Sequence, residues 1–122
     1  MPQAPLNAAT AVNPSGKFVM NQVDAQGNEF IASGKTGVYN VTALTAVKAS
    51  AGRVVKVVVN VASSTAVKVY DVATTSGAAT ANLIYAGPAT SVVGTVISLD
   101  WPCANGIVVD PGTGGTVSVN YI

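Results

Sequence analysis

Short apolar stretches with a two-residue repeat dominate the chain from Gly37 onward, and the clearest of them covers residues 53–61. Every second residue along part of this stretch is a valine: Val55, Val57, Val59 and Val61. Side chains alternate between the two faces of a β-strand, so this spacing predicts a strand with one wholly apolar face. The opposite face, which carries Lys56 and Asn60, is mixed and is expected to be half covered.

Similar patterns predict six further short strands, separated by turns rich in Gly, Pro, Ser, Asn and Asp. These strands cover residues 38–44, 65–72, 82–85, 91–99, 106–109 and 116–122. Residues 100–103 are expected to form a corner, and no helix is expected after residue 36. Valine far outnumbers leucine, as suits a pleated surface. Connections of hairpin length cannot join parallel strands. We therefore predict an all-β domain over residues 37–122, a mostly antiparallel β-sandwich or small barrel, with its last strand at a sheet edge.

Residues 1–36 have a different character, being rich in Ala, Asn, Gln, Pro, Gly and Ser. Their apolar pieces are short, and too little apolar area is present to offset the entropy of ordering. We interpret this segment as an extended N-terminal arm that becomes ordered by docking on something else. The alternative is a flexible tail without a role.

Charged residues make up only 9% of the chain, against about a quarter in an average protein. The net charge is +1, and the basic residues are scattered, which argues against nucleic-acid binding. Lys48, Arg53 and Lys56 lie close in sequence, but a solvated strand end accounts for them. A surface with so little charge repels copies of itself weakly and tolerates dense packing against neighbours.

The sequence also bears on the compartment. It shows neither a secretory signal nor an apolar run of membrane-spanning length, so no membrane partner is expected. The single Cys103 allows no internal disulfide, which fits folding in a reducing cytoplasm.

The residues that most enzymes use are scarce. There is no histidine, which removes the Ser–His and Cys–His nucleophilic systems and the commonest metal ligand. Cys103 is expected to pack in the core rather than react. Asp71, Asp100 and Asp110 follow strands beside turn residues, so capping of turns is favoured over a glycosidase pair or a calcium loop. We expect no catalytic, cofactor-binding or metal-binding residues, no cofactor and no enzymatic activity.

Two further features invite a binding interpretation. Residues 112–115 form a glycine-rich run, but the Lys-Ser or Lys-Thr pair of a P-loop is missing and a β-hairpin is expected around it. Trp101 precedes Pro102 in an apolar stretch, where a core or corner position is favoured over a ligand-binding aromatic.

The chain from Gly37 to its end resembles a family of small structural proteins of tailed bacteriophages and prophages. A first group of residues comprises Val69-Tyr70-Asp71, Ser76-Gly77-Ala78-Ala79, Asn82 and Ile84. A second comprises the run from Asp100 to Val109, Pro111-Gly112-Thr113-Gly114 and Val117-Ser118-Val119. About two thirds of the chain is covered, and the arm is not.

This resemblance implies a component of the virion, such as a capsid decoration protein, a head fibre or a tail-associated subunit. The favoured hypothesis is a decoration or cement subunit on the capsid surface, made in the cytoplasm of the bacterial host. Its partners would be the major capsid protein or other virion subunits. A homo-oligomer is expected, and a trimer is favoured because decoration proteins often occupy threefold positions. The alternatives are a tail, neck or fibre component, or a carbohydrate-binding β-module for the host surface, which would use Tyr39, Tyr70, Tyr85 or Trp101.

Overall fold

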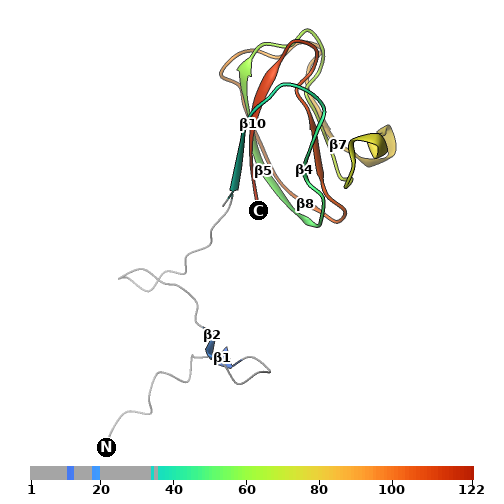
Figure 1. The fold of residues 1–122 in the computed structure, drawn as a ribbon. Helices are drawn as coiled ribbons and strands as arrows, with labels where there is room; N and C mark the ends of the chain where they lie inside the picture. Colours follow the sequence, from blue (N-terminus) through green and yellow to red (C-terminus); the bar gives the residue numbers. More distant parts are fainter. Residues whose placement is uncertain (1–10, 13–17, 20–33, 35) are drawn as a thin grey trace, which may run out of the picture. The chain divides into compact units, whose positions relative to one another are not determined.

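The computed structural model describes residues 11–12, 18–19, 34 and 36–122 (Figure 1). The chain divides into two units, Met1–Ala32 and Ser33–Ile122. In the first unit, strand β1 (Ala11–Val12) pairs antiparallel with β2 (Phe18–Val19). The predicted extended arm of residues 1–36 lies for the most part outside the described residues.

The second unit contains eight strands in two four-stranded antiparallel sheets. The strands are β3 (Thr36–Val41), β4 (Thr45–Lys48), β5 (Gly52–Val61), β6 (Lys68–Tyr70), β7 (Leu83–Ala86), β8 (Val96–Cys103), β9 (Ile107–Asp110) and β10 (Thr116–Tyr121). One sheet has the order β3-β10-β5-β8 and the other the order β4-β9-β6-β7. The predicted all-β antiparallel sandwich is confirmed, and the alternative of a closed barrel is not what the chain forms. Two single-turn 3₁₀ helices, Thr75–Gly77 and Thr80–Asn82, lie in the β6–β7 connection.

The order of the strands is that of a jelly roll, in which eight antiparallel strands fill two sheets. Every connection from β3 to β10 crosses from one sheet to the other except β6–β7. The glycine-rich residues 112–115 therefore join β9 of one sheet to β10 of the other, and the expected hairpin around them is wrong. The expectation that the last strand forms a sheet edge is also wrong, because β10 lies between β3 and β5. The edges are β3 and β8 in one sheet and β4 and β7 in the other.

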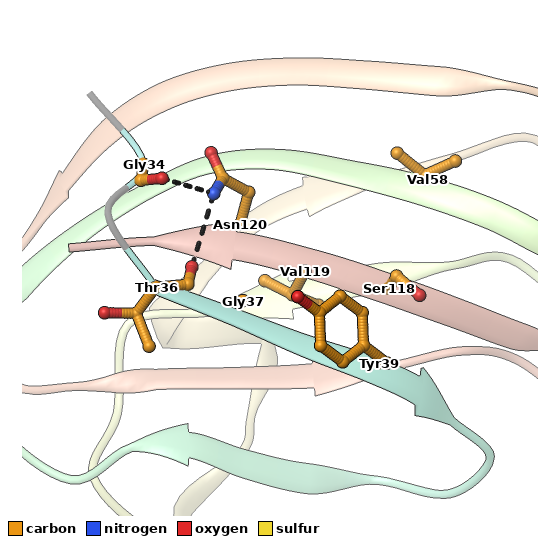
Figure 2. A pocket seen from close by; sticks show the side chains of 8 residues that line it. All are labelled: Gly34, Thr36, Gly37, Tyr39, Val58, Ser118, Val119 and Asn120. Carbon is orange, nitrogen blue, oxygen red and sulfur yellow. Dashed lines mark hydrogen bonds between the residues drawn. The ribbon is translucent and has the colours of Figure 1, made fainter. Parts of the chain in front are cut away.

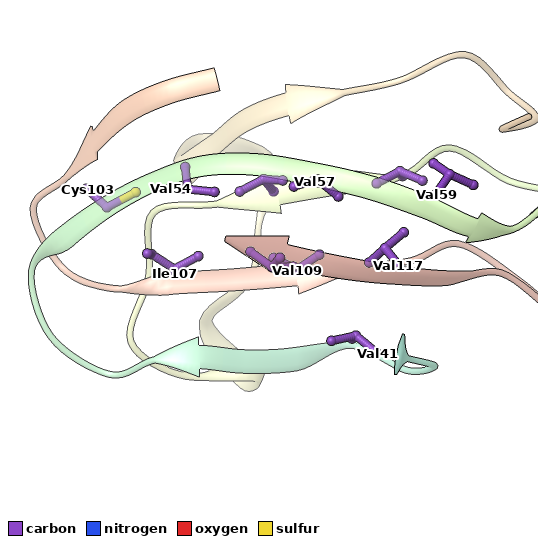
Figure 3. Close-up of a cluster of buried hydrophobic side chains, with 11 residues drawn as sticks. Val41, Val54, Val57, Val59, Cys103, Ile107, Val109 and Val117 are labelled. Atoms are coloured by element: carbon purple, nitrogen blue, oxygen red, sulfur yellow. The ribbon is translucent and has the colours of Figure 1, made fainter. Parts of the chain in front are cut away.

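The core between the sheets is built almost entirely from valine (Figure 3). Among the described residues, valine supplies eleven of the thirteen buried apolar positions, and Cys103 and Ile107 supply the other two. β-Branched side chains are stiff and pack well on a pleated surface, which suits them to the narrow space between two sheets. Burying each valine contributes about 1.5 kcal/mol or more.

The apolar face of β5 differs from the predicted one because the strand is irregular at Val55. The register of β5 shifts between Val54 and Lys56 against β8, and also against β10. An extra residue in a strand changes which side chains point inward. Val54, Val57 and Val59 join the core cluster, whereas Val55 is buried outside that cluster and Val61 is 48% exposed. The predicted face is therefore correct in its middle and wrong at both ends.

A second irregularity changes the inward face of β3. Asn40 has a φ of 54°, in the left-handed region that Asn tolerates better than most residues. The register against β10 shifts at the same place, so that Val38 and Val41, three residues apart, both pack on the core. Regular alternation along the predicted strand would place these two residues on opposite faces. The predicted strand over residues 38–44 also ends early, at Val41, and the separate strand β4 was missed.

Strand β8 continues through residues 100–103, where a corner was expected. Asp100 has a φ of 46°, and the register against β5 shifts beside it. Pro102 cannot donate to a ladder, and it is tolerated because β8 is an edge strand. In the residues that the structure describes, no helix reaches the length and apolar character that a membrane crossing needs.

Val57→Asp should prevent folding, because Val57 is fully buried in the core and an unpaired buried carboxylate costs several kcal/mol. Val61→Asp places the same carboxylate on the same strand at a half-exposed position and should change the free energy of unfolding by less than about 1 kcal/mol. Circular dichroism and urea denaturation of the two variants measure this difference. Equal damage from both substitutions would show that Val61 belongs to the core and would contradict the register assigned to β5.

Candidate functional site

The outer face of the β3-β10-β5-β8 sheet is hollowed by a groove with a volume of about 270 Å³ (Figure 2). Its lining comes from the three neighbouring strands β3, β10 and β5 and from the residue ahead of β3. These residues are Gly34, Thr36, Gly37, Tyr39, Val58, Ser118, Val119 and Asn120. The lining contains hydroxyl, amide and apolar groups and no charged side chain.

Asn120 holds one end of this groove in place. Its side-chain Nδ2 donates to the carbonyl oxygens of Gly34, at 2.6 Å, and Thr36, at 3.3 Å (Figure 2). The chain entering β3 is thereby fixed to β10. Gly34 has a φ of 76°, and a Cβ there would overlap the Asn120 side chain, so that only glycine permits this approach.

The other end of the groove carries a small polar network. The Ser118 hydroxyl oxygen accepts from the Asn40 backbone N–H at 3.2 Å and from Asn60 Nδ2 at 2.7 Å. Asn60 Nδ2 also donates to Asn40 Oδ1 at 3.2 Å. The left-handed backbone of Asn40 is thus stabilised by side chains from β10 and from β5, the next strand beyond it.

Tyr39 is the aromatic residue of this face. Its side chain is 78% exposed, and its ring lies beside Gly37, close to where a Cβ of that residue would be. An aromatic ring beside hydroxyl and amide groups can bind a ligand that is itself partly apolar and partly hydrogen-bonding.

A second surface feature is apolar. Four exposed valines lie on two neighbouring segments, at the end of β5 and from the β7–β8 connection into β8. We call them the valine strip: Val61, Val92, Val93 and Val96, which are 48%, 68%, 59% and 55% exposed. Val58 pairs with Val96, and Val59 exchanges backbone hydrogen bonds with Gly94 and Thr95, which places these segments side by side.

Asp71 fixes the connection between β8 and β9. Its carboxylate accepts from three consecutive backbone N–H groups, those of Ala104 at 3.0 Å, Asn105 at 2.8 Å and Gly106 at 3.3 Å. Partial burial raises the pKa of the Asp71 carboxyl, but these three donors together outweigh that effect and hold the pKa below its usual value. The predicted capping role is confirmed, although the capped turn is more than thirty residues away in sequence.

The other two acids of the sandwich have separate structural contacts. Asp110 Oδ1 accepts from the Gly112 backbone N–H at 2.9 Å, which confirms the turn predicted there. Asp100 caps no turn, contrary to expectation, and forms an exposed ion pair with Arg53 at 3.3 Å. Asp71 and Asp100 lie near one end of the sandwich and Asp110 at the other, because β9 runs between them. The described part of the chain has no cluster of three or more His, Cys, Asp or Glu side chains able to hold a metal ion.

The predictions made for Cys103 and Trp101 have different outcomes. Cys103 is 3% exposed and belongs to the core cluster, so the predicted packing role is confirmed. Burial raises the pKa of its thiol, and the neighbouring Asp71 carboxylate raises that pKa further, which disfavours the reactive thiolate. Trp101 is 51% exposed on the edge strand β8, so the expected core or corner position is wrong.

Sequence reasoning found neither the groove nor the valine strip. The groove depends on β10 lying between β3 and β5, and strand order is not written in any local pattern. The run Ser91-Val92-Val93 looked like the start of a strand. A Val-Val-Gly sequence followed by Thr is also compatible with a turn, and the glycine was the available signal.

Asp71→Asn should lower the free energy of unfolding at pH 7 by about 1 to 2 kcal/mol, because an amide accepts less strongly and its NH₂ cannot accept at all. The folded-state pKa of Asp71 is depressed, so its contribution is fully present above the unfolded pKa of about 3.9 and is lost as the pH falls through the folded pKa.

Urea denaturation between pH 7 and pH 2 measures this effect, and the difference between wild type and Asp71→Asn should shrink on acidification. Asp100→Asn is the matched control, with an expected change below about 0.5 kcal/mol because its ion pair is exposed. A difference that stays constant down to pH 2 would contradict the assigned role of the carboxylate.

Comparison of the chain with models of protein families, with curated protein sequences and with solved structures found no match.

Proposed function

We propose that this chain is a non-enzymatic structural subunit that works by binding other protein subunits. The observation that carries the proposal is the exposed valine strip on a surface with very few charges. Exposed large apolar side chains that gather on neighbouring segments of a surface mark a site of interaction more often than isolated ones do. A scarcity of charge also removes the repulsion that would keep neighbours apart.

The chemistry of the acids and of the thiol supports a non-enzymatic role. Asp71 and Asp110 are engaged by backbone N–H groups, and Asp100 pairs with Arg53. The Cys103 thiol is buried and its pKa is raised. Each of these groups therefore has a structural role that accounts for its position.

The more specific part of the proposal follows from the resemblance over residues 37–122. On that ground the chain is a subunit of a tailed-bacteriophage virion, and a decoration or cement subunit on the capsid surface is favoured over a tail, neck or fibre component. The major capsid protein is its proposed partner. A homotrimer fits the threefold positions of a capsid. The jelly-roll fold is used by viral capsid domains and also by lectins, so it is compatible with this proposal without deciding it.

Capsids of the encoding phage, assembled without this protein, test the proposal directly. Purified full-length chain should sediment with these capsids and raise their melting temperature, because a ligand of the assembled state stabilises it. A shortened chain that begins at Ser33 should bind less, since the predicted arm is expected to supply much of the contact. Failure of the full-length chain to sediment with capsids, together with labelling of purified tails, would replace the decoration proposal by the tail alternative.

A second candidate function is binding of a neutral carbohydrate, and the groove beside Tyr39 favours it. Tyr39 is the most exposed large apolar side chain of the described residues and lies next to hydroxyl and amide groups. Sugars present apolar C–H faces and hydroxyls, which an aromatic ring and such polar groups can match. The absence of charged side chains from the lining selects for an uncharged sugar.

Titration of the ¹⁵N-labelled protein with neutral oligosaccharides tests the carbohydrate candidate. Backbone amide shifts should change at Gly37, Ser118 and Asn120, and Tyr39→Ala should abolish the change. Tyr39→Phe keeps the ring and is the matched control, which should bind within about tenfold of wild type. Shifts confined to residues outside the groove, or none at all, would remove this candidate.

A further inference from the structure

We propose that the valine strip is the contact through which copies of this chain associate with one another. The inference rests on the proposed function only in taking the chain to act by binding protein subunits. It adds the surface that is used and commits to a second copy of the same chain as its occupant.

The conformation of the β7–β8 connection exposes valine at a turn. The Thr95 backbone N–H donates to the Val92 carbonyl oxygen at 3.2 Å, and Gly94 has a φ of 86°. This is a tight turn with Val93 at its first central position. Turn tips on a surface are usually polar or glycine-rich. Here the tip presents two consecutive valines to solvent. Exposing them to water costs free energy, and a partner that buries them would remove this cost.

Hydrogen bonds on both sides hold this turn in place. Val59 accepts from the Gly94 N–H at 2.9 Å and donates to the Thr95 carbonyl at 2.9 Å. On its other side, the buried Ser91 hydroxyl accepts from the Ser63 backbone N–H at 3.0 Å. The backbone that carries the valines is thus held in place before any partner arrives, so little backbone entropy would be lost on association.

The lack of charge around the strip favours a second copy of the chain as its occupant. Residues 57–67 and 87–99, which carry the valine strip and its surroundings, contain no charged residue. A strongly acidic or basic partner would find no complementary group there. A second copy of the same strip meets neither repulsion nor an unpaired charge. A twofold axis, or a threefold axis that passes through the strip, brings the same patch of each copy together.

A sheet edge lies beside the valine strip, at the start of β8. Val96 begins β8, whose outer side has no strand partner among the described residues. An unpaired edge offers backbone N–H and C=O groups to another chain. The left-handed backbone at Asp100 and the missing N–H of Pro102 hinder strand pairing along the second half of β8. The part of the edge that can pair with another chain is therefore the part next to Val96.

The position of the strip leaves the other end of the sandwich available. Gly34, where the described sandwich begins, is bonded to Asn120 near the end of β10, whereas the valine strip lies beside the start of β8 and the end of β5. Antiparallel pairing places these features at opposite ends of one sheet. Association through the strip is therefore compatible with a different partner bound near Gly34.

Analytical ultracentrifugation of the full-length chain from micromolar to millimolar concentration tests the inference. The wild type should associate reversibly, and Val93→Asp should weaken that association by about 30-fold or more, the scale of an interface hot spot. Val93 is 59% exposed at a turn tip, so the thermal melting of the monomer should be unchanged. Ser76→Asp, which adds the same charge at an exposed position of the β6–β7 connection, is the control and should associate like the wild type.

A second variant keeps the test valid if Val93→Asp fails to fold. The double substitution Val92→Ser with Val93→Ser keeps the turn uncharged and should also weaken association at least tenfold, because it removes most of the apolar area of the turn. A wild type that stays monomeric throughout, or association unchanged in both folded variants, would overturn the inference.

The capsid experiment keeps this inference separate from the proposed function. A chain that binds capsids while remaining monomeric, both free and on the particle, would overturn the inference and the proposed trimer and leave the proposed capsid binding intact. Association through the strip without binding to capsids or other virion parts would support the inference and remove the proposed role in the virion.

Discussion

Almost every connection passes from one sheet to the other, so the two sheets must lie close together along their whole length. Valine makes this close packing possible. Stacked sheets are about 10 Å apart, and short β-branched side chains from both inner faces fill that space in few rotamers. The core is accordingly nearly all valine, and Tyr85 and Tyr121 pack partly buried against it. Tyr39 and Trp101 remain exposed at the surface.

Local patterns predicted the class of the fold because alternation of apolar residues is a local property. Strand β5 was found from the spacing of Val57 and Val59, which do face the core. The same reasoning failed at Asn40 and Val55, because a strand irregularity reverses the alternation and depends on the neighbouring strands as well as on the residue itself. A single inserted position was enough to turn part of each predicted face the wrong way.

The candidate site was less accessible to sequence reasoning because its parts come together only through strand order. The groove needs β10 between β3 and β5, and the Asp71 cap joins residues that are far apart in the chain. Neither arrangement follows from spacing. The turn in the valine strip was not predicted for another reason, because a pair of valines before a glycine is more typical of a strand than of a turn. What the sequence did indicate correctly was the shortage of charge, which characterises the whole surface.

The central place of β10 has a consequence for how the chain is made. Strands β3 and β5 are not neighbours, and each pairs with β10, the last strand of the sandwich to leave the ribosome. Until β10 emerges, this sheet lacks its middle and the valines of β5 have no cover on that side. Assembly of this sheet must therefore wait until β10 has been translated, and the nascent chain passes through a stage in which chaperones would find exposed valine-rich segments.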